Sequence, residues 1–214
     1  MDKAAFLARL PKGGIEPPAM PPGPPEPAPA NALQTLVQKL EATGMGVHQI
    51  KGAQAALEHA LALVKQSGAS RLGVADLGGE LNGFLQEAAH SQGVELISAG
   101  DDRGRVEAIE PLPAGLTRAE LAVAQVGALI QVARSGGGRL LSLMPPLHVA
   151  LLHTDDVLPA MDDLPLALQD PKRFPEGMPP AVSIMGGPSK TGDIEAVIVL
   201  GVHGPGRVEV VIWT

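Results

Sequence analysis

The first half of the chain alternates amphipathic helical segments with short apolar runs, and this alternation constrains the fold more than any other feature. Apolar residues recur at spacings of three and four along segments that end at Gly44, Gly68 and Gly93, which predicts three helices. The runs 71–75 and 94–98 predict short buried strands after the second and third helices. Such an alternation, joined by short glycine turns, predicts an α/β fold with a mixed, mostly parallel sheet flanked by helices.

The second half of the chain is richer in strand patterns. Thr117 and Glu120 have the spacing of a capping box, which predicts a short helix there. Asp155 or Asp156 could cap a further helix, broken by prolines, that reaches Leu168. The remaining apolar runs, which are typical of strands, lie at 128–132, 139–143, 147–153, 181–185 and 207–213.

Proline content marks a boundary near the N-terminus. Residues 11–30 contain nine prolines, so this stretch can form neither a helix nor a central strand. We expect residues 1–30 to form a short helix followed by an extended linker. Asn31 is a suitable N-cap for the first core helix, so residues 31–214 are expected to form a single α/β domain.

Composition excludes several classes of function. A net charge of −7 and an aromatic content of 2% argue against binding to nucleic acid or to an anionic membrane surface. The chain has no cysteine, which excludes disulfides, thiolate zinc sites and the usual iron–sulfur ligation. We therefore expect no cofactor on this chain. No signal peptide and no membrane span is evident, so a cytoplasmic location is expected.

The glycine-rich segment 186–191 (GGPSKT) is the first candidate site. It follows a predicted strand, and we expect it to open a helix, whose free backbone N–H groups favour an anion. Ser189 and Thr191 can donate hydrogen bonds, and Lys190 can place its charge on a phosphate or carboxylate. The order of the residues is not that of a Walker A loop. The alternative is a plain turn in which Thr191 only caps the helix.

Polar residues continue beyond this turn. Asp193 and Glu195 could act as acid, base or metal ligand, or could simply stabilise a first helical turn by their negative charge. The β-branched residues of 193–200 also suit a strand, but its apolar positions follow a helical face and we expect a helix. His203 and Gly204 form a sharp turn, in which the imidazole could serve as a general base, contact a carboxylate or bond only to backbone.

Two histidines of the run 147–153 are expected to be structural. His148 and His153 lie five residues apart, so on a strand their side chains point to opposite faces. They cannot form a pair of metal ligands on one face, and we predict no metal site in the chain.

Several segments together resemble one protein family. The run GGPSKTGDIE followed by VLGVHGPGRVEVVI resembles the C-terminal signature of the lactate-utilisation protein C family, the LUD-domain proteins. The runs GLTRAELAVAQVGALI, RLLSLMPPLHVALL and DDVLPAM fit the middle of that family in the same order. The resemblance covers residues 31–214. The matching candidates for an anion or ligand site are Gly186, Gly187, Ser189, Lys190, Thr191, Asp193, Glu195, His203 and Gly204.

The resemblance implies a fold like that of ribose-5-phosphate isomerases and CoA-transferases. It also implies a role in oxidising L-lactate to pyruvate together with iron–sulfur subunits, which would carry the clusters that a cysteine-free chain cannot hold. One departure concerns a Thr-Gly-Thr element that members of the family usually show at the end of a central helix. Val126, Gly127 and Ala128 stand there in this chain, so two hydroxyl donors are missing.

Three hypotheses follow, of which the third is a scaffold that binds no ligand. The first is a cytoplasmic, non-redox subunit of an iron–sulfur lactate-oxidising system that binds a small carboxylate or organises its partners. The second is a stand-alone enzyme or binding protein for a phosphorylated or CoA-linked metabolite, which Lys190 would hold by its anionic group.

Overall fold

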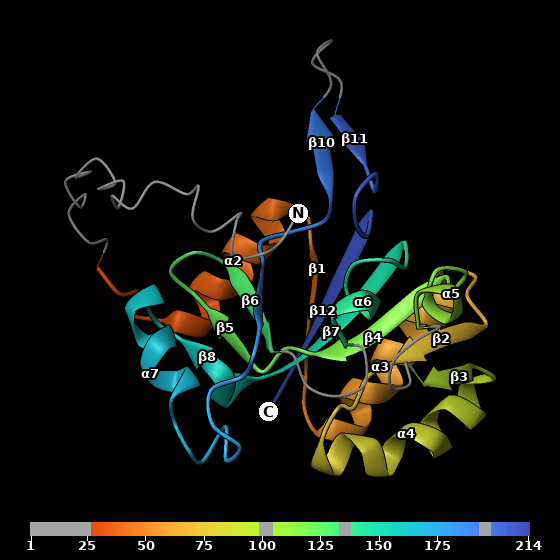
Figure 1. The fold of residues 1–214 in the computed structure, drawn as a ribbon, viewed down its shortest axis with the longest axis horizontal. Coiled ribbons are helices and arrows are strands. Elements are labelled where there is room, and N and C mark those ends of the chain that lie inside the picture. The colour runs from red at the N-terminus through yellow and green to blue at the C-terminus, as the bar shows by residue number, and fades with distance from the viewer. Residues whose placement is uncertain (1–26, 99–104, 133–137, 193–197) are drawn as a thin grey trace, which may run out of the picture.

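The computed structural model describes residues 27–98, 105–132, 138–192 and 198–214. Its centre is a six-stranded sheet in which all neighbouring strands are parallel (Figure 1). The order across this main sheet is β1 (Gly46–Ile50), β12 (Arg207–Trp213), β7 (Leu147–His153), β4 (Ala114–Arg118), β2 (Arg71–Val74) and β3 (Glu95–Ser98). The predicted α/β fold with a mostly parallel sheet and flanking helices is confirmed.

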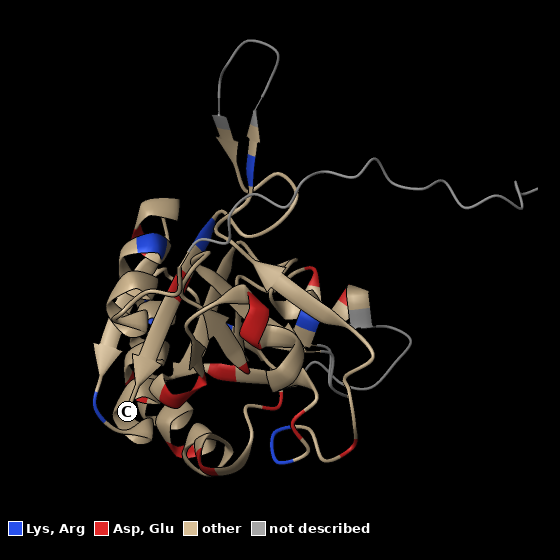
Figure 2. Cartoon of the chain, turned by 90° about the vertical axis from the view of Figure 1, so that its left-hand side faces the viewer, with Lys and Arg blue, Asp and Glu red and all other residues tan. Residues whose placement is uncertain are grey.

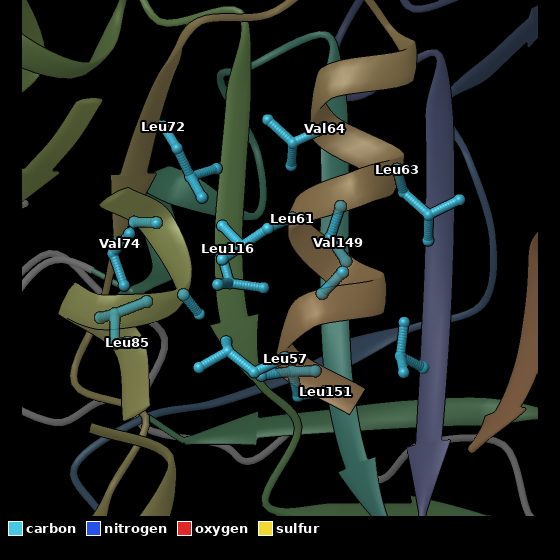
Figure 3. Close-up of a cluster of buried hydrophobic side chains, with 14 of the residues drawn as sticks. Leu57, Leu61, Leu63, Val64, Leu72, Val74, Leu85, Leu116, Val149 and Leu151 are labelled. Carbon is cyan, nitrogen blue, oxygen red and sulfur yellow. The ribbon is translucent and has the colours of Figure 1, made fainter. Parts of the chain in front are cut away.

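One face of the main sheet is covered by α3 (Ala53–Gln66) and α4 (Gly79–Gln92). Leu57, Leu61 and Val64 form the apolar stripe of α3 and are fully buried. Figure 3 shows this stripe over Leu116 and Val149 of the central strands. The helical spacing seen in the sequence therefore marks the face that the sheet buries.

The opposite face carries α2 (Ala32–Thr43), and farther along the sheet α5 (Arg105–Ile109) and α6 (Gly138–Leu141). The predicted caps of α2 are confirmed: the Asn31 side chain accepts a hydrogen bond from the backbone N–H of Gln34, and Gly44 ends the helix with a φ of 95°. Leu36 and Leu40 of α2 are fully buried on this side.

A second, smaller sheet packs beside α2. Its strands, in spatial order, are β8 (Val157–Leu158), β5 (Leu121–Val123), β6 (Ala128–Val132) and β9 (Val182–Met185). One face of this sheet contributes Ala122 and Leu129 to the cluster around α2. The other face packs against the short helix α7 (Leu164–Leu168).

The capping-box prediction at Thr117 is wrong. Thr117 lies inside strand β4, where it is fully buried, and Glu120 precedes strand β5. The Glu120 carboxylate accepts a hydrogen bond from the backbone N–H of Val132 on a neighbouring strand instead of capping a helix. Residues 121–123 are buried on both faces of the small sheet, so burial overrides the local capping pattern.

Three further local predictions need correction. The run 139–143 begins as helix α6 and is not a strand. The expected helix between Asp155 and Leu168 is split into η1 (Thr154–Asp156), β8, η2 (Met161–Asp163) and α7, as its prolines suggest. Asp156 caps no long helix there, and its buried carboxylate instead forms ion pairs with the partly exposed side chains of Arg118 and Arg173. Strand β1 lies at an edge of the main sheet and had no counterpart in the prediction.

A two-stranded hairpin stands out from the body of the protein, as Figures 1 and 2 both show. Its strands β10 (Lys190–Gly192) and β11 (Ile198–Leu200) are antiparallel. The helix expected over 193–200 is therefore wrong at 198–200, where the β-branched residues form a strand. Residues 193–197, with the candidates Asp193 and Glu195, lie outside the described part of the chain.

Candidate functional site

A cleft of about 380 Å³ lies at the end of the main sheet where β1, β7 and β12 begin, and residues of hairpin strand β10 contribute to its lining. Met45, His148 and Val208 belong to its lining, and they stand at the amino ends of β1, β7 and β12. Because these three strands are parallel neighbours, their amino ends lie together at the same end of the sheet. The other lining residues are Ser142, Leu143, Ile184, Met185, Gly186, Gly187, Ser189, Lys190, Thr191, His203, Gly204 and Pro205.

Seven of the nine predicted site residues line this one cleft: Gly186, Gly187, Ser189, Lys190, Thr191, His203 and Gly204. The other two, Asp193 and Glu195, fall outside the described residues. The structure thus brings together two segments, 186–191 and 203–204, that the sequence could only suggest were neighbours.

The local geometry of 186–191 differs from the prediction. The segment joins strand β9 to strand β10, so it opens no helix, and Thr191 is a strand residue and not an N-cap. A helix N-terminus therefore cannot supply anion-binding N–H groups here. Gly187 has a φ of 146°, and a Cβ at that position would lie 3.2 Å from the Cβ of Thr43, so glycine allows the turn to approach α2 closely.

Lys190 supplies the positive charge of the cleft. Its Nζ donates a hydrogen bond to the backbone oxygen of Thr43, at 2.5 Å, where helix α2 ends. A cation at the carboxyl end of a helix is favoured by the helix dipole, which explains where the ammonium rests. The described lining residues include no aspartate or glutamate, so the cleft favours an anion over a cation.

Ser189 fastens the hairpin base to the following turn. Its backbone N–H donates to the oxygen of Pro205, and its backbone oxygen accepts from the N–H of Gly201. Its hydroxyl accepts from the backbone N–H of His203, at 3.2 Å, which leaves the hydroxyl proton able to bond a ligand. Gly204 permits this contact, because a Cβ there would lie 3.3 Å from the Cβ of Ser189.

His148, which is expected to be structural, also lines the cleft. As predicted, it points away from His153, which packs edge-on against Trp213 on the other face of the sheet. Its ring is almost fully buried at the wall of the cleft, and its Nε2 lies 2.9 Å from the Thr117 hydroxyl. Burial lowers the pKa of His148 from 6.5 to about 4, so its imidazole is neutral at pH 7. The sequence signal that could have pointed to this position is a histidine within an apolar strand pattern.

A second, much smaller crevice lies at the opposite end of the main sheet, beyond the carboxyl ends of β2 and β4. Asp76, Arg118, Glu120 and Gln131 contribute to its lining. Its volume of about 20 Å³ suits one water molecule, which needs about 10–15 Å³ on this measure, but no metabolite.

The residues that stand in place of the expected Thr-Gly-Thr element lie outside the cleft. Val126 and Gly127 lie in the turn between β5 and β6 and Ala128 begins β6, so none of the three ends a helix, and none lines the cleft. Gly127 instead lies against Lys39 of α2, so close that a Cβ would be 2.5 Å from the Lys39 Cβ. The missing hydroxyls do not alter the lining of the cleft.

The described residues provide neither a cluster of metal ligands nor a membrane-spanning helix. No group of three or more histidine, aspartate or glutamate side chains in this part of the chain could hold a metal ion. Within the same residues, the helices are too short or too polar for any of them to cross a membrane.

Comparisons with known proteins agree on one family. A model of the LUD domain family matches residues 33–213. The lactate utilization protein C of Halalkalibacterium halodurans is 31% identical over 127 residues, which are 59% of this chain and 54% of that protein. The uncharacterized protein YkgG of Escherichia coli is 34% identical over 96 residues, which are 45% of this chain and 42% of that protein. The chain spans about half the length of the curated relatives it matches.

A crystal structure supports the fold. A DUF162 family protein from Deinococcus radiodurans superposes with a TM-score of 0.59 and 22% sequence identity, over 86% of this chain and 96% of that one. At this level of identity the similarity establishes the shared fold alone.

Proposed function

The chain belongs to the LUD domain family, and from this premise we propose that it acts in lactate utilisation, as a cytoplasmic, non-redox subunit of a system that oxidises L-lactate to pyruvate. Several relatives carry the name lactate utilization protein C, among them that of Anoxybacillus flavithermus, 28% identical over 134 residues. In this proposal the electrons pass to iron–sulfur clusters on partner chains. The chain itself has no cysteine thiolate to hold a cluster.

The observation that carries the proposal is the cleft at the amino ends of β1, β7 and β12. It collects the family-like segments 186–191 and 203–204, and its charge comes from Lys190 without an aspartate or glutamate among the described lining residues. Lactate is an anion at neutral pH, so such a cleft attracts its carboxylate. Ser189 and Lys190 would hold the carboxylate, and neutral His148 would face the hydroxyl.

The test is a pull-down of the tagged protein from cells grown on L-lactate. The recovered material is assayed for iron and for lactate oxidation, and a strain that lacks the gene is grown on lactate as the only carbon source. Recovery of a cysteine-rich, iron-containing partner with activity supports the proposal. Recovery of the protein alone, together with normal growth of the deletion strain on lactate, refutes it.

Replacement of Lys190 tests the ligand site directly. We expect Lys190→Ala to weaken binding of a carboxylate ligand by about 1.5–3 kcal/mol, the usual contribution of a charged hydrogen bond, or roughly ten- to a hundredfold in Kd. Isothermal titration calorimetry on the purified chain measures this effect. The matched control is Lys51→Ala, since Lys51 is exposed and follows the carboxyl end of β1, away from the cleft. Equal affinities of the two variants would contradict the assignment.

The second candidate function is a stand-alone enzyme or binding protein for a phosphorylated or CoA-linked metabolite. The volume of the cleft favours it, because about 300–1,000 Å³ is typical of sites for ligands much larger than a three-carbon acid. Lys190 would then hold a phosphate. Calorimetry with a phosphate monoester in place of lactate distinguishes the two candidates.

A further inference from the structure

The apolar lining of the cleft is more extensive than a lactate methyl group requires. Met45 and Val208 are buried at its wall, where β1 and β12 begin. Leu143 and Ile184 also line it, and they are 50% and 54% exposed. Large apolar side chains that stay exposed around a concave site are typical of places that bind the apolar part of a ligand.

The volume points the same way. The cleft measures about 380 Å³, whereas a single water molecule needs only about 10–15 Å³ on the same measure. A three-carbon acid held at Lys190 would leave much of this space to water. Water molecules next to Leu143 and Ile184 leave the apolar surface of these side chains hydrated, which is unfavourable. A ligand that displaces this water and covers both side chains therefore binds more tightly than lactate.

The polar lining adds a second requirement. The Nε2 of His148 is engaged by the hydroxyl of Thr117, and the Nδ1 of the same ring has no hydrogen-bond partner among the described residues. A neutral imidazole can donate or accept at this second nitrogen, depending on the tautomer. Because His148 belongs to the lining of the cleft, this second nitrogen is the one left to bond a ligand, and it suits a hydroxyl or carbonyl next to the carboxylate.

We propose that the cleft takes a 2-hydroxy carboxylate whose apolar chain or ring is larger than the methyl group of lactate. The carboxylate lies at Lys190 and Ser189, the hydroxyl bonds to His148, and the apolar part covers Leu143 and Ile184. This assignment rests on the proposed function, from which it takes the hydroxy acid, and it extends that function to a substrate class of longer or aromatic acids.

The experiment is calorimetry on the full chain with a graded series: L-lactate, L-2-hydroxybutyrate, L-2-hydroxyhexanoate and L-3-phenyllactate. We expect the affinity to rise about fourfold for each methylene group that becomes buried, so that L-2-hydroxyhexanoate binds tens of times more tightly than L-lactate. Equal or weaker binding of the longer acids would overturn the inference.

Variants locate the apolar contact. The double variant Leu143→Ser with Ile184→Ser changes two exposed residues, so the fold should persist, and it should flatten the dependence on chain length. Leu166→Ser is the matched control, because Leu166 is 73% exposed on α7 and does not line the cleft. If both variants keep the full dependence on chain length, the apolar subsite is elsewhere and the inference fails.

The contact between His148 and the ligand hydroxyl is measured by the ratio of two affinities, that for L-2-hydroxyhexanoate and that for hexanoate. The wild type should bind L-2-hydroxyhexanoate at least several times more tightly than hexanoate, which lacks the hydroxyl. In His148→Leu combined with Thr117→Val, which removes both partners of the buried hydrogen bond, the ratio should fall to about one while the dependence on chain length persists. An unchanged ratio in the folded double variant would refute this contact, whatever its effect on stability.

The outcomes also separate this inference from the proposed function. If the protein binds the graded acids as expected but no iron-containing partner is recovered with it, the ligand class is supported and the subunit role is refuted. If the partner is recovered but the affinity does not depend on the length of the acid, the subunit role is supported and the ligand class is refuted. Tighter binding of hexyl phosphate than of L-2-hydroxyhexanoate would also refute the hydroxy acid, in favour of a phosphorylated ligand.

Discussion

Burial of His148 predicts a specific loss of stability in mild acid. In the folded protein the pKa of this imidazole is about 4, because burial disfavours its charged form, whereas in the unfolded chain the pKa returns to about 6.5. Between these two values the unfolded chain binds a proton that the folded protein does not. Protonation therefore favours unfolding, and stability is lost as the pH falls from 6.5 towards 4.

The magnitude follows from these two pKa values. The loss from His148 is about 2 kcal/mol at pH 5, and it levels off near 3 kcal/mol below pH 4. His59 acts in the same direction, since burial and, second, the neighbouring His48 lower its pKa. A comparison of the wild type with a single variant cancels the contribution of His59 and of the carboxylates.

The test is His148→Gln, which removes the titrating group and keeps a side chain able to bond to Thr117. Urea unfolding at pH 7.5 and pH 5 can be followed by the fluorescence of Trp213, the only tryptophan in the chain, which is buried on strand β12. We expect the wild type to lose about 2 kcal/mol more than the variant between the two pH values. His90→Gln, at an exposed position on α4, serves as control and should behave like the wild type. Equal losses in the wild type and in His148→Gln would refute the reasoning.

Two further predictions concern the scaffold and use the same unfolding assay at pH 7.5. Gly46→Ala should destabilise the protein by about 1–3 kcal/mol, because the new Cβ would lie 1.8 Å from the Glu209 carboxylate. Gly83→Ala is the control: Gly83 lies in open space on α4, so this change should be neutral or stabilising by up to about 1 kcal/mol. Similar effects of the two substitutions would contradict the close contact. Asn31→Ala should cost about 1 kcal/mol by removing the cap of α2, and a loss below a few tenths of that value would show that the cap contributes little.

The three long helices of the first half, with strands β2 and β3, were predictable because local pattern and tertiary burial agree there, whereas β1 was not predicted. Leu57, Leu61 and Val64 repeat at helical spacing, and all three face the sheet. The stretch around Thr117 was mispredicted because its polar spacing imitates a helix start. There the Thr117 hydroxyl satisfies a buried histidine of a strand 31 residues away, a partner that no local pattern reveals.

The candidate site shows the same division. Most of its residues were identifiable, since segments 186–191 and 203–204 are polar and glycine-rich between apolar strands, and the structure places seven of the nine predicted residues in one cleft. The expected mechanism of anion binding at a helix N-terminus was not correct, because the turn leads into a β-hairpin. The pairing of β10 with β11 depends on cross-strand contacts, and these cannot be read from the helical spacing of a few apolar residues.

The sequence by itself determined the class of fold, the apolar faces of the main helices, the ends of α2 and the family, since each of these depends on residue type and local spacing. Only the tertiary structure decided that His148 belongs to the cleft and that Lys190 rests on the end of α2. The physical reason is that parallel strands far apart in the chain bring their amino ends to one end of the sheet. The neighbours of a side chain at that end, and hence its charge state and its partners, follow from the order of the strands and not from the order of the residues.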